Sequence, residues 1–255
     1  MSMDQYSPTG FRMLPLVVKN LLIINGICFL ATMGLGQAFN IDLNDILGLH
    51  YFGSYLFKPY QLVTYMFLHG GFGHIFFNMF ALWMFGYVLE NFWGPKKFLI
   101  YYFVTGIGAA LVQMAIGYFQ ISHLEASMTQ EQISTVVNEG YKILLENKNA
   151  VDPLMGQLNA LYNTSTIGAS GAVFGILLAF GMMFPNTMIY VYFAIPIKAK
   201  WFVILYGGLE LVSGIYNARG DNVAHFAHLG GMLFGIILIL IWKRQYKKKQ
   251  FHDQF

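Results

Sequence analysis

Six long apolar stretches restrict the fold of this chain more than any other feature. They cover residues 14–36, 75–92, 98–120, 171–184, 201–217 and 223–242. Of the 255 residues, 56% are hydrophobic and only 11% are charged, which is typical of an integral membrane protein and not of a soluble domain. Because backbone polar groups find no water in lipid, such stretches are expected to be helical. The sequence therefore predicts an all-α polytopic membrane helical bundle with six transmembrane helices.

The basic residues predict how this bundle is oriented. Cytoplasmic loops of membrane proteins carry the excess of Lys and Arg. With a cytosolic N-terminus, the inner segments hold eleven such residues and the outer segments hold four, which are Lys58, Lys142, Lys148 and Arg219. This asymmetry predicts both termini in the cytosol. The basic tail, residues 243–255, is expected to contact anionic lipid of the bilayer, with no binding of nucleic acid.

The fourth apolar stretch is too short to cross a membrane alone, and a glycine-flanked serine begins it. About 15 helical residues at about 1.5 Å each reach only about 22 Å, against a hydrocarbon core of about 30 Å. This helix is therefore expected to start inside the membrane, with Ser170 facing a water-filled recess. Gly168 and Gly171 beside it suit a sharp turn and a close approach of two backbones.

Polar side chains gather at the same ends of three predicted helices. His74 and Asn78 are four residues apart and share one face of the second helix, and His228 lies near the start of the sixth. Small residues on the fourth and sixth helices allow close packing, which brings Ser170 and His228 to the same depth. They are Gly171, Gly175, Ala179, Gly231 and Gly235.

A serine beside an imidazole is a nucleophile with its general base. The backbone N–H groups at the helix start, with His74 and Asn78, can form an oxyanion hole for acyl transfer. No carboxylate stands out as a third member, because Asp221 lies outside the sixth helix and Glu210 lies on the fifth. The residues therefore predict a serine–histidine dyad.

These motifs resemble those of the rhomboid intramembrane serine proteases. The matching residues are His74 and Asn78 of a His-xxx-Asn motif, Gly168, Ser170 and Gly171 of a Gly-x-Ser-Gly motif, and Ala227, His228, Gly231 and Gly235 of an Ala-His-xx-Gly-xxx-Gly motif. The resemblance implies a serine endopeptidase that cuts peptide bonds in or near transmembrane segments of membrane-protein substrates, without metal or cofactor. The enzyme is expected in a bacterial inner membrane, with its active site opening to the outer face.

The resemblance also implies a role for each matched residue. Ser170 is expected to be the nucleophile and His228 the base, with His74, Asn78 and the Ser170 N–H as oxyanion donors. Gly168, Gly171 and Gly231 would support the site. His69 matches a structural histidine of the first outer loop, and Glu90 to Gly94 matches a Glu-xxx-Gly motif at the end of the second helix.

This chain departs from the family pattern in three places. Tyr60-Gln61 replaces a Trp-Arg pair in the first outer loop, so the polar contacts around that arginine must differ here. Phe174 stands where many members have a tyrosine against the catalytic histidine, and it is expected to keep the ring packing. The polar outer insertion, residues 121–166, is longer than in compact bacterial members.

The whole chain, residues 1–255, is expected to be one membrane domain. Its outer loop, residues 37–73, is rich in aromatic side chains and is expected to lie at the membrane interface. Apolar residues at helical spacing favour a small helical hairpin within 121–166, and disorder is the alternative. Nothing in the residues specifies an oligomeric state.

Two other functions remain open from the residues alone. A protease-dead relative would bind membrane clients, although it would not need both Ser170 and His228. A transporter would use Glu210 with the histidines, since a carboxylate within the membrane often marks a transport pathway. A metal site at His225 and His228 lacks a third ligand at helical spacing, so no metal is expected.

Overall fold

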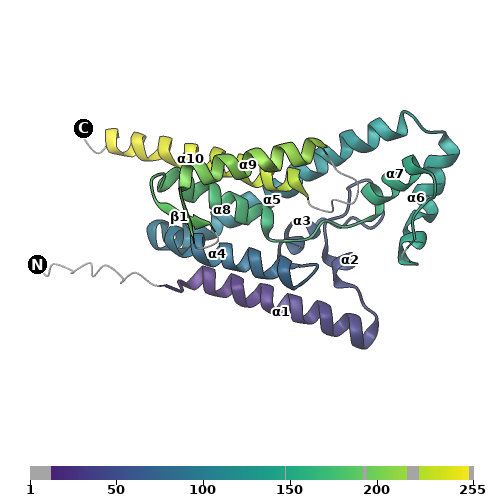
Figure 1. Cartoon of the computed structure of the whole chain (residues 1–255), viewed down its shortest axis with the longest axis horizontal. Coiled ribbons are helices and arrows are strands. Elements are labelled where there is room, and N and C mark those ends of the chain that lie inside the picture. Colours follow the sequence, from purple (N-terminus) through teal and green to yellow (C-terminus); the bar gives the residue numbers. More distant parts are fainter. Residues whose placement is uncertain (1–12, 147, 192–193, 217–223, 253–255) are drawn as a thin grey trace, which may run out of the picture.

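The computed structural model of the chain describes residues 13–146, 148–191, 194–216 and 224–252, and helices make up most of it (Figure 1). Each predicted apolar stretch coincides with a helix, which confirms the helical membrane bundle. These six helices are α1 (Leu16–Phe39), α4 (Phe72–Trp93), α5 (Pro95–Glu125), α8 (Ser170–Met183), α9 (Ala199–Tyr216) and α10 (His225–His252). Helices α1, α4, α5 and α10 are long and apolar enough to cross a membrane by themselves.

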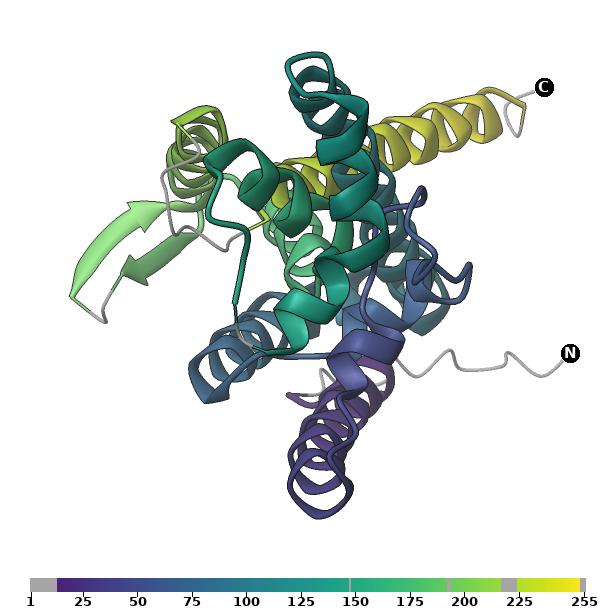
Figure 2. The same cartoon turned by 90° about the vertical axis from the view of Figure 1, so that its right-hand side faces the viewer.

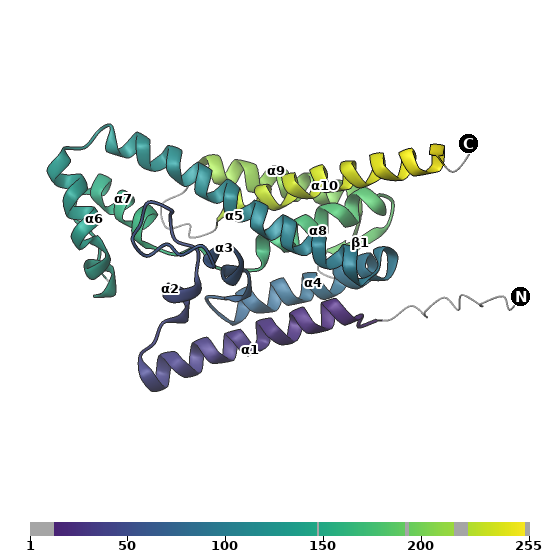
Figure 3. The same cartoon turned by 180° about the vertical axis from the view of Figure 1, so that it is seen from behind.

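Short elements connect these helices. They are α2 (Leu43–Leu47), α3 (Gln61–Thr64), the 3₁₀ helix η1 (Tyr65–Phe67), α6 (Gln130–Leu145), α7 (Pro153–Asn163), β1 (Met188–Val191) and β2 (Ile195–Lys198). The start of α1 and the end of α10 lie at the same end of the bundle, and α6 and α7 lie at the opposite end (Figures 1 and 3). This arrangement agrees with an even number of membrane crossings.

Helix α8 forms the centre of the bundle. Every residue from Gly171 to Gly181 is buried, and the helix packs against α4, α5, α9 and α10. A Cβ atom on Gly231 of α10 would lie 1.8 Å from the Gly171 carbonyl oxygen, so the two backbones are in direct contact. Gly175 instead faces Thr105 of α5, where an added Cβ would lie 2.6 Å from the threonine Cβ. The small face of α8 therefore fits between α5 and α10, whereas the sequence analysis considered only its packing with the sixth helix.

Glu90 near the end of α4 joins that helix to the start of α1. Its Oε1 accepts a 2.9 Å hydrogen bond from the Val17 N–H, and its Oε2 accepts one of 2.8 Å from the Val18 N–H. These are two of the N–H groups that lack a partner within a helix, and the carboxylate also complements the helix dipole. Gly94 ends α4 with φ +80°, a backbone angle that favours glycine. The Glu-xxx-Gly motif therefore closes one corner of the bundle.

The polar insertion forms the helical hairpin that its apolar spacing favours. A capping box between Thr129 and Gln132 begins α6, and the Asp152 side chain caps the start of α7. Val136 and Leu158 pack together in a small core beneath the hairpin. The third apolar helix is longer than predicted, because α5 continues to Glu125.

A two-stranded antiparallel ribbon, β1 and β2, precedes α9 and is absent from the sequence-based expectation. Met188 pairs with Lys198 and Val191 pairs with Ile195. Both strands are short and rich in branched and aromatic residues, which suit a pleated surface. Figure 2 shows this ribbon standing out from the bundle beside α9.

Candidate active site

Ser170 and His228 meet at the contact between α8 and α10. Ser170 is the first residue of α8, and His228 lies in the first turn of α10. The distance from His228 Nε2 to Ser170 Oγ is 2.8 Å, a normal hydrogen bond. The His228 side chain is buried, with only 7% of the residue exposed. The two residues that the motifs single out are thus in contact, although they are 58 positions apart in the chain.

Gly168 shapes the space in front of the serine hydroxyl. Its φ of +131° is a conformation that side chains rarely tolerate, and its N–H donates a 2.9 Å hydrogen bond to the Tyr65 carbonyl oxygen. A Cβ atom there would lie 2.8 Å from His74 Nε2 and 3.5 Å from Ser170 Oγ. The open side of this glycine therefore lies between the imidazole of α4 and the serine hydroxyl.

The segment that leads to Ser170 is tied to the first outer loop. Leu49 and Thr166 exchange two backbone hydrogen bonds of 2.9 and 2.8 Å. Ser165 Oγ donates a further hydrogen bond of 2.9 Å to the Asn44 carbonyl oxygen. Both contacts lie within five residues of Ser170, so the outer loop helps to set where α8 begins.

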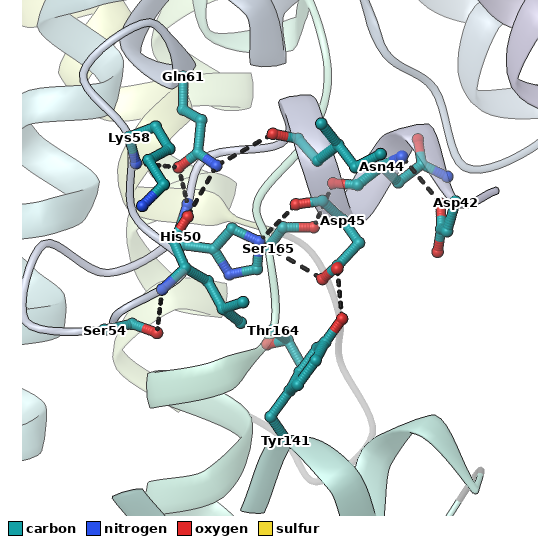
Figure 4. A network of polar contacts seen from close by, with 12 residues as sticks. Asp42, Asn44, Asp45, His50, Ser54, Lys58, Gln61, Tyr141, Thr164 and Ser165 are labelled. Atoms are coloured by element: carbon teal, nitrogen blue, oxygen red, sulfur yellow. Dashed lines mark hydrogen bonds and ion pairs between the residues drawn. The ribbon is translucent and has the colours of Figure 1, made fainter. Parts of the chain in front are cut away.

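The first outer loop contains a polar network around Gln61, the residue at the position of the family's arginine (Figure 4). The Gln61 side chain is buried, and its Nε2 donates to the carbonyl oxygens of Ile46 and Leu56 at 3.2 and 3.1 Å. Its Oε1 accepts from the N–H groups of His50 and Lys58 at 3.3 and 3.1 Å. One uncharged amide therefore holds four backbone groups of the loop together.

The same network reaches the insertion hairpin (Figure 4). The Tyr141 hydroxyl of α6 donates a 2.5 Å hydrogen bond to Asp45 Oδ2, and His50 Nε2 lies 2.8 Å from the Asp45 carbonyl oxygen. Burial and the adjacent Asp45 carboxylate raise the pKa of Tyr141, which therefore stays a hydrogen-bond donor at neutral pH. The hairpin and the outer loop form one connected cap next to the segment that carries Ser170.

His74 and Asn78, the predicted oxyanion donors, have different surroundings. The Gly70 N–H donates a long 3.4 Å hydrogen bond to His74 Nδ1, which leaves the proton of a neutral ring on Nε2, the atom beside Gly168. Asn78 Nδ2 instead donates a 2.9 Å bond back to the His74 carbonyl oxygen. His74 thus presents a donor toward Ser170 in this conformation, whereas the Asn78 amide is engaged within its own helix.

Phe174 lies one turn after Ser170 and packs on the His228 ring. The ring centroids are 4.1 Å apart and the planes differ by only 5°. The ring of Tyr206 in α9 is the second aromatic neighbour of Phe174, with the two ring centroids 4.9 Å apart. The substitution of a tyrosine by Phe174 therefore preserves the stacked ring that restricts the imidazole.

Glu210 is the functional side chain that the sequence reasoning left outside the site. Its Oε2 lies 2.8 Å from His228 Nδ1 and 2.7 Å from His225 Nδ1, and the residue is 7% exposed. Glu210 is the twelfth of 18 residues in α9, so it lies in the half of the helix nearest the start of α10. The fifth predicted helix runs from the inner to the outer face, so Glu210 in its second half lies at about the depth of His228. This match in depth was the signal in the sequence that could have placed Glu210 in the site.

Glu210, His225 and His228 form what we call the acid–imidazole cluster, whose ligand atoms all lie within 4.8 Å of one another. Glu210 supplies, from another helix, the third ligand that helical spacing did not offer. Two ligands of a tetrahedral zinc ion at about 2.0–2.1 Å are separated by about 3.3 Å. The distances of 2.7 and 2.8 Å in the cluster are shorter and match hydrogen bonds. The three side chains are thus joined by hydrogen bonds in this structure, and only His228 also contacts Ser170.

Comparison with known proteins identifies the family. The Rhomboid domain family model matches residues 56–129 and 133–245, which include α4 through most of α10. RHOMBOID-like protein 12, mitochondrial, of Arabidopsis thaliana is 26% identical over 89% of this chain and 58% of its own length. Rhomboid protein 1, mitochondrial, of Saccharomyces cerevisiae is 26% identical over 72% of this chain and 42% of its own length.

One bacterial relative is named as a protease. Rhomboid protease AarA of Providencia stuartii is 25% identical over 69% of this chain and 53% of its own length. The chain thus spans about half the length of the curated relatives that it matches. The family match covers more than half of the chain and contains both Ser170 and His228. On this evidence the resemblance seen in the motifs is confirmed, and the chain belongs to the rhomboid family of membrane proteins.

Proposed function

We propose that this protein is an intramembrane serine endopeptidase that hydrolyses peptide bonds in or near transmembrane segments of membrane proteins. Ser170 is the nucleophile and His228 is the general base. The observation that carries the proposal is the 2.8 Å distance between His228 Nε2 and Ser170 Oγ at the start of a short central helix. Family membership supports the same reaction class.

In the first step, the Ser170 hydroxyl attacks the carbonyl carbon of the substrate peptide while His228 Nε2 accepts its proton. The protonated imidazole then gives this proton to the leaving amine, and an acyl-enzyme forms on Ser170 Oγ. Water, deprotonated by the same imidazole, hydrolyses the ester and restores the serine. The reaction therefore needs water at the depth where α8 begins.

Three donors are proposed for the developing oxyanion. The Ser170 N–H has no partner within its own helix because it begins α8, and His74 Nε2 borders the space beside Gly168. Asn78 joins them only by releasing its hydrogen bond to the His74 carbonyl oxygen. Asn78 would exchange this bond for one to the oxyanion after the substrate binds. The change is small, since a rotation of the Asn78 side chain is enough.

The substrate is proposed to be a membrane protein whose transmembrane helix unwinds locally. A regular helix hides its carbonyl groups in backbone hydrogen bonds, so Ser170 cannot attack them. Unwinding in lipid leaves these groups without partners, which makes small or helix-breaking residues favourable near the cut and makes turnover slow. We further propose that the protein lies in a cell membrane with both termini in the cytosol and the site opening outward. The Lys and Arg asymmetry supports this orientation.

A client-binding protein without protease activity is the alternative. Such a protein has no need of a hydrogen-bonded pair of serine and imidazole at a helix start, and this pair is intact here. A transporter that uses Glu210 with the histidines is less well supported, because it has no need of the hydrogen bond between His228 and Ser170.

Labelling with a fluorophosphonate probe tests the proposal on purified protein in detergent. Wild type is expected to be labelled, and Ser170→Ala and His228→Ala are expected to lose labelling. Ser134→Ala is the matched serine control and should label as wild type, because this half-buried serine of α6 donates its hydroxyl to the Glu131 carbonyl oxygen. Absence of labelling in folded wild-type protein would contradict the proposal and would favour client binding.

A further inference from the structure

We infer that Glu210 is a positioning residue for the proposed reaction, which it serves by holding the His228 imidazole for proton exchange with Ser170. The inference rests on the proposed function and extends the predicted dyad to a relay of three residues. A line of two contacts carries it. Glu210 Oε2 lies 2.8 Å from His228 Nδ1, and His228 Nε2 lies 2.8 Å from Ser170 Oγ.

The carboxylate determines which ring nitrogen of His228 carries the proton. An ionised carboxylate only accepts hydrogen bonds, so the Nδ1 atom against Glu210 must be the protonated one. In a neutral imidazole the lone pair is then on Nε2, which is the atom that lies against Ser170 Oγ. A general base needs this tautomer, because only an unprotonated Nε2 can take the serine proton. Glu210 therefore selects the reactive form of the ring.

Glu210 also stabilises the charge that forms during the reaction. When His228 accepts the serine proton it becomes an imidazolium, whose Nδ1–H still points at the carboxylate. Both residues are only 7% exposed, so water screens this attraction weakly. The same arrangement of carboxylate, imidazole and hydroxyl operates in soluble serine proteases.

The three side chains come from three different helices. Ser170 begins α8, Glu210 lies in α9, and His228 lies in α10, while Phe174 holds the face of the imidazole. The position of the ring is therefore set by an edge contact on each side and by one stacked face. Selection of the tautomer then requires α9 to be packed in the place where it is observed.

His225 offers a control for this inference. Its Nδ1 lies 2.7 Å from the same Glu210 oxygen, and no contact with Ser170 is required of it in the relay. A carboxylate oxygen accepts two hydrogen bonds, so both imidazoles can be served at once. Removing His225 takes away a partner of Glu210 of the same kind, yet leaves the line from Glu210 to Ser170 intact.

The test compares Glu210→Gln with His225→Gln. The first variant keeps the size of the side chain and removes its charge. The rate of fluorophosphonate labelling and kcat on a transmembrane substrate in detergent are expected to fall at least tenfold in Glu210→Gln, with KM unchanged. For comparison, replacing the carboxylate by an amide in a soluble serine protease lowers kcat about 10⁴-fold. His225→Gln is expected to stay within about threefold of wild type.

A smaller loss in Glu210→Gln than tenfold, or an equal loss in His225→Gln, would overturn the inference. Nitrogen-15 NMR of histidine-labelled wild type gives a readout that does not depend on the folding of the Glu210 variant. The His228 signal, assigned by its disappearance in His228→Ala, is expected to show a protonated Nδ1 and an unprotonated Nε2, and the reverse would refute the inference. The proposed function fails separately, if wild type is not labelled at Ser170.

Discussion

A methyl group added at Gly231 should disable the site without touching any of its reacting groups. The Cβ of Gly231→Ala would lie 1.8 Å from the Gly171 carbonyl oxygen and 2.7 Å from its carbonyl carbon. These are backbone atoms of α8, so no side chain can rotate out of the way. To reach even the closest real separation of about 3.0 Å, α10 must move away from α8 by at least 1.2 Å.

This displacement has a calculable effect on the reaction. His228 is on the same helix as Gly231, and its 2.8 Å contact with Ser170 would lengthen to as much as about 4 Å, beyond hydrogen-bonding distance. A misplacement of about 1 Å at a reacting pair costs on the order of 100-fold in rate. Overpacking of a buried contact also lowers the free energy of unfolding by about 1–3 kcal/mol.

The assay is the rate of fluorophosphonate labelling, with the thermal unfolding midpoint measured on the same samples. Gly208→Ala is the matched control, because a Cβ added there meets no atom within 4 Å among the described residues, apart from the adjacent backbone of its own helix. Labelling should fall about 100-fold in Gly231→Ala and remain at the wild-type rate in Gly208→Ala. Folded Gly231→Ala protein that labels as fast as wild type would refute the argument that backbone contact sets the distance from His228 to Ser170.

Further predictions concern ring stacking, acid stability, the outer network and metal. Phe174→Ala should lower labelling about tenfold because the stacked ring is lost, whereas Phe174→Tyr should stay near wild type, and equal rates would contradict this. Burial and the adjacent histidine lower the pKa of His69 to about 3, so the folded chain resists a proton that the unfolded chain binds below about pH 6.5. The contribution of His69 to the free energy of unfolding is complete above that pH and falls by about 2 kcal/mol from pH 7 to pH 5. The thermal unfolding midpoint of His69→Phe should therefore fall less in acid than that of wild type. Identical pH profiles for the two proteins would contradict this prediction. Tyr141→Phe removes the hydrogen bond to Asp45 and should destabilise the cap by about 1 kcal/mol, seen as faster hydrogen exchange in α6 with unchanged labelling, and unaltered exchange would count against it. EDTA should not change labelling, because the acid–imidazole cluster is spaced for hydrogen bonds; loss that zinc restores would disprove this.

The sequence predicted the helices and their membrane character well, for a physical reason. Backbone groups in lipid must be satisfied within each segment, so an apolar stretch has almost no alternative to a helix. The sequence likewise predicted that Ser170 would begin the fourth helix, and α8 begins at that residue. The ribbon of β1 and β2 was missed because its two strands are only four residues each, too short for a clear alternating pattern.

The candidate site was predictable only where local motifs carried it. Ser170 and His228 each lie in a recognisable sequence pattern, whereas Glu210 lies in none, and its role depends on a contact between two helices. The depth of Glu210 within α9 could have been compared with that of His228, but the rotation of one helix against another is not encoded by spacing. The amide that replaces an arginine, Gln61, is similar: the sequence indicated a change there, and the four bonds that it makes follow from the path of the loop.

The ties between the outer loop and the segment before α8 limit how the length of this chain can vary. Residues 164–169 join α7 to α8. Within this segment, Ser165, Thr166 and Gly168 are hydrogen-bonded to Asn44, Leu49 and Tyr65, respectively. One inserted or deleted residue would shift the following chain by about 3.5 Å, more than the whole distance between Ser170 and His228. Insertions and deletions are therefore expected to accumulate in the turn between α6 and α7, where a change in length does not reach the nucleophile.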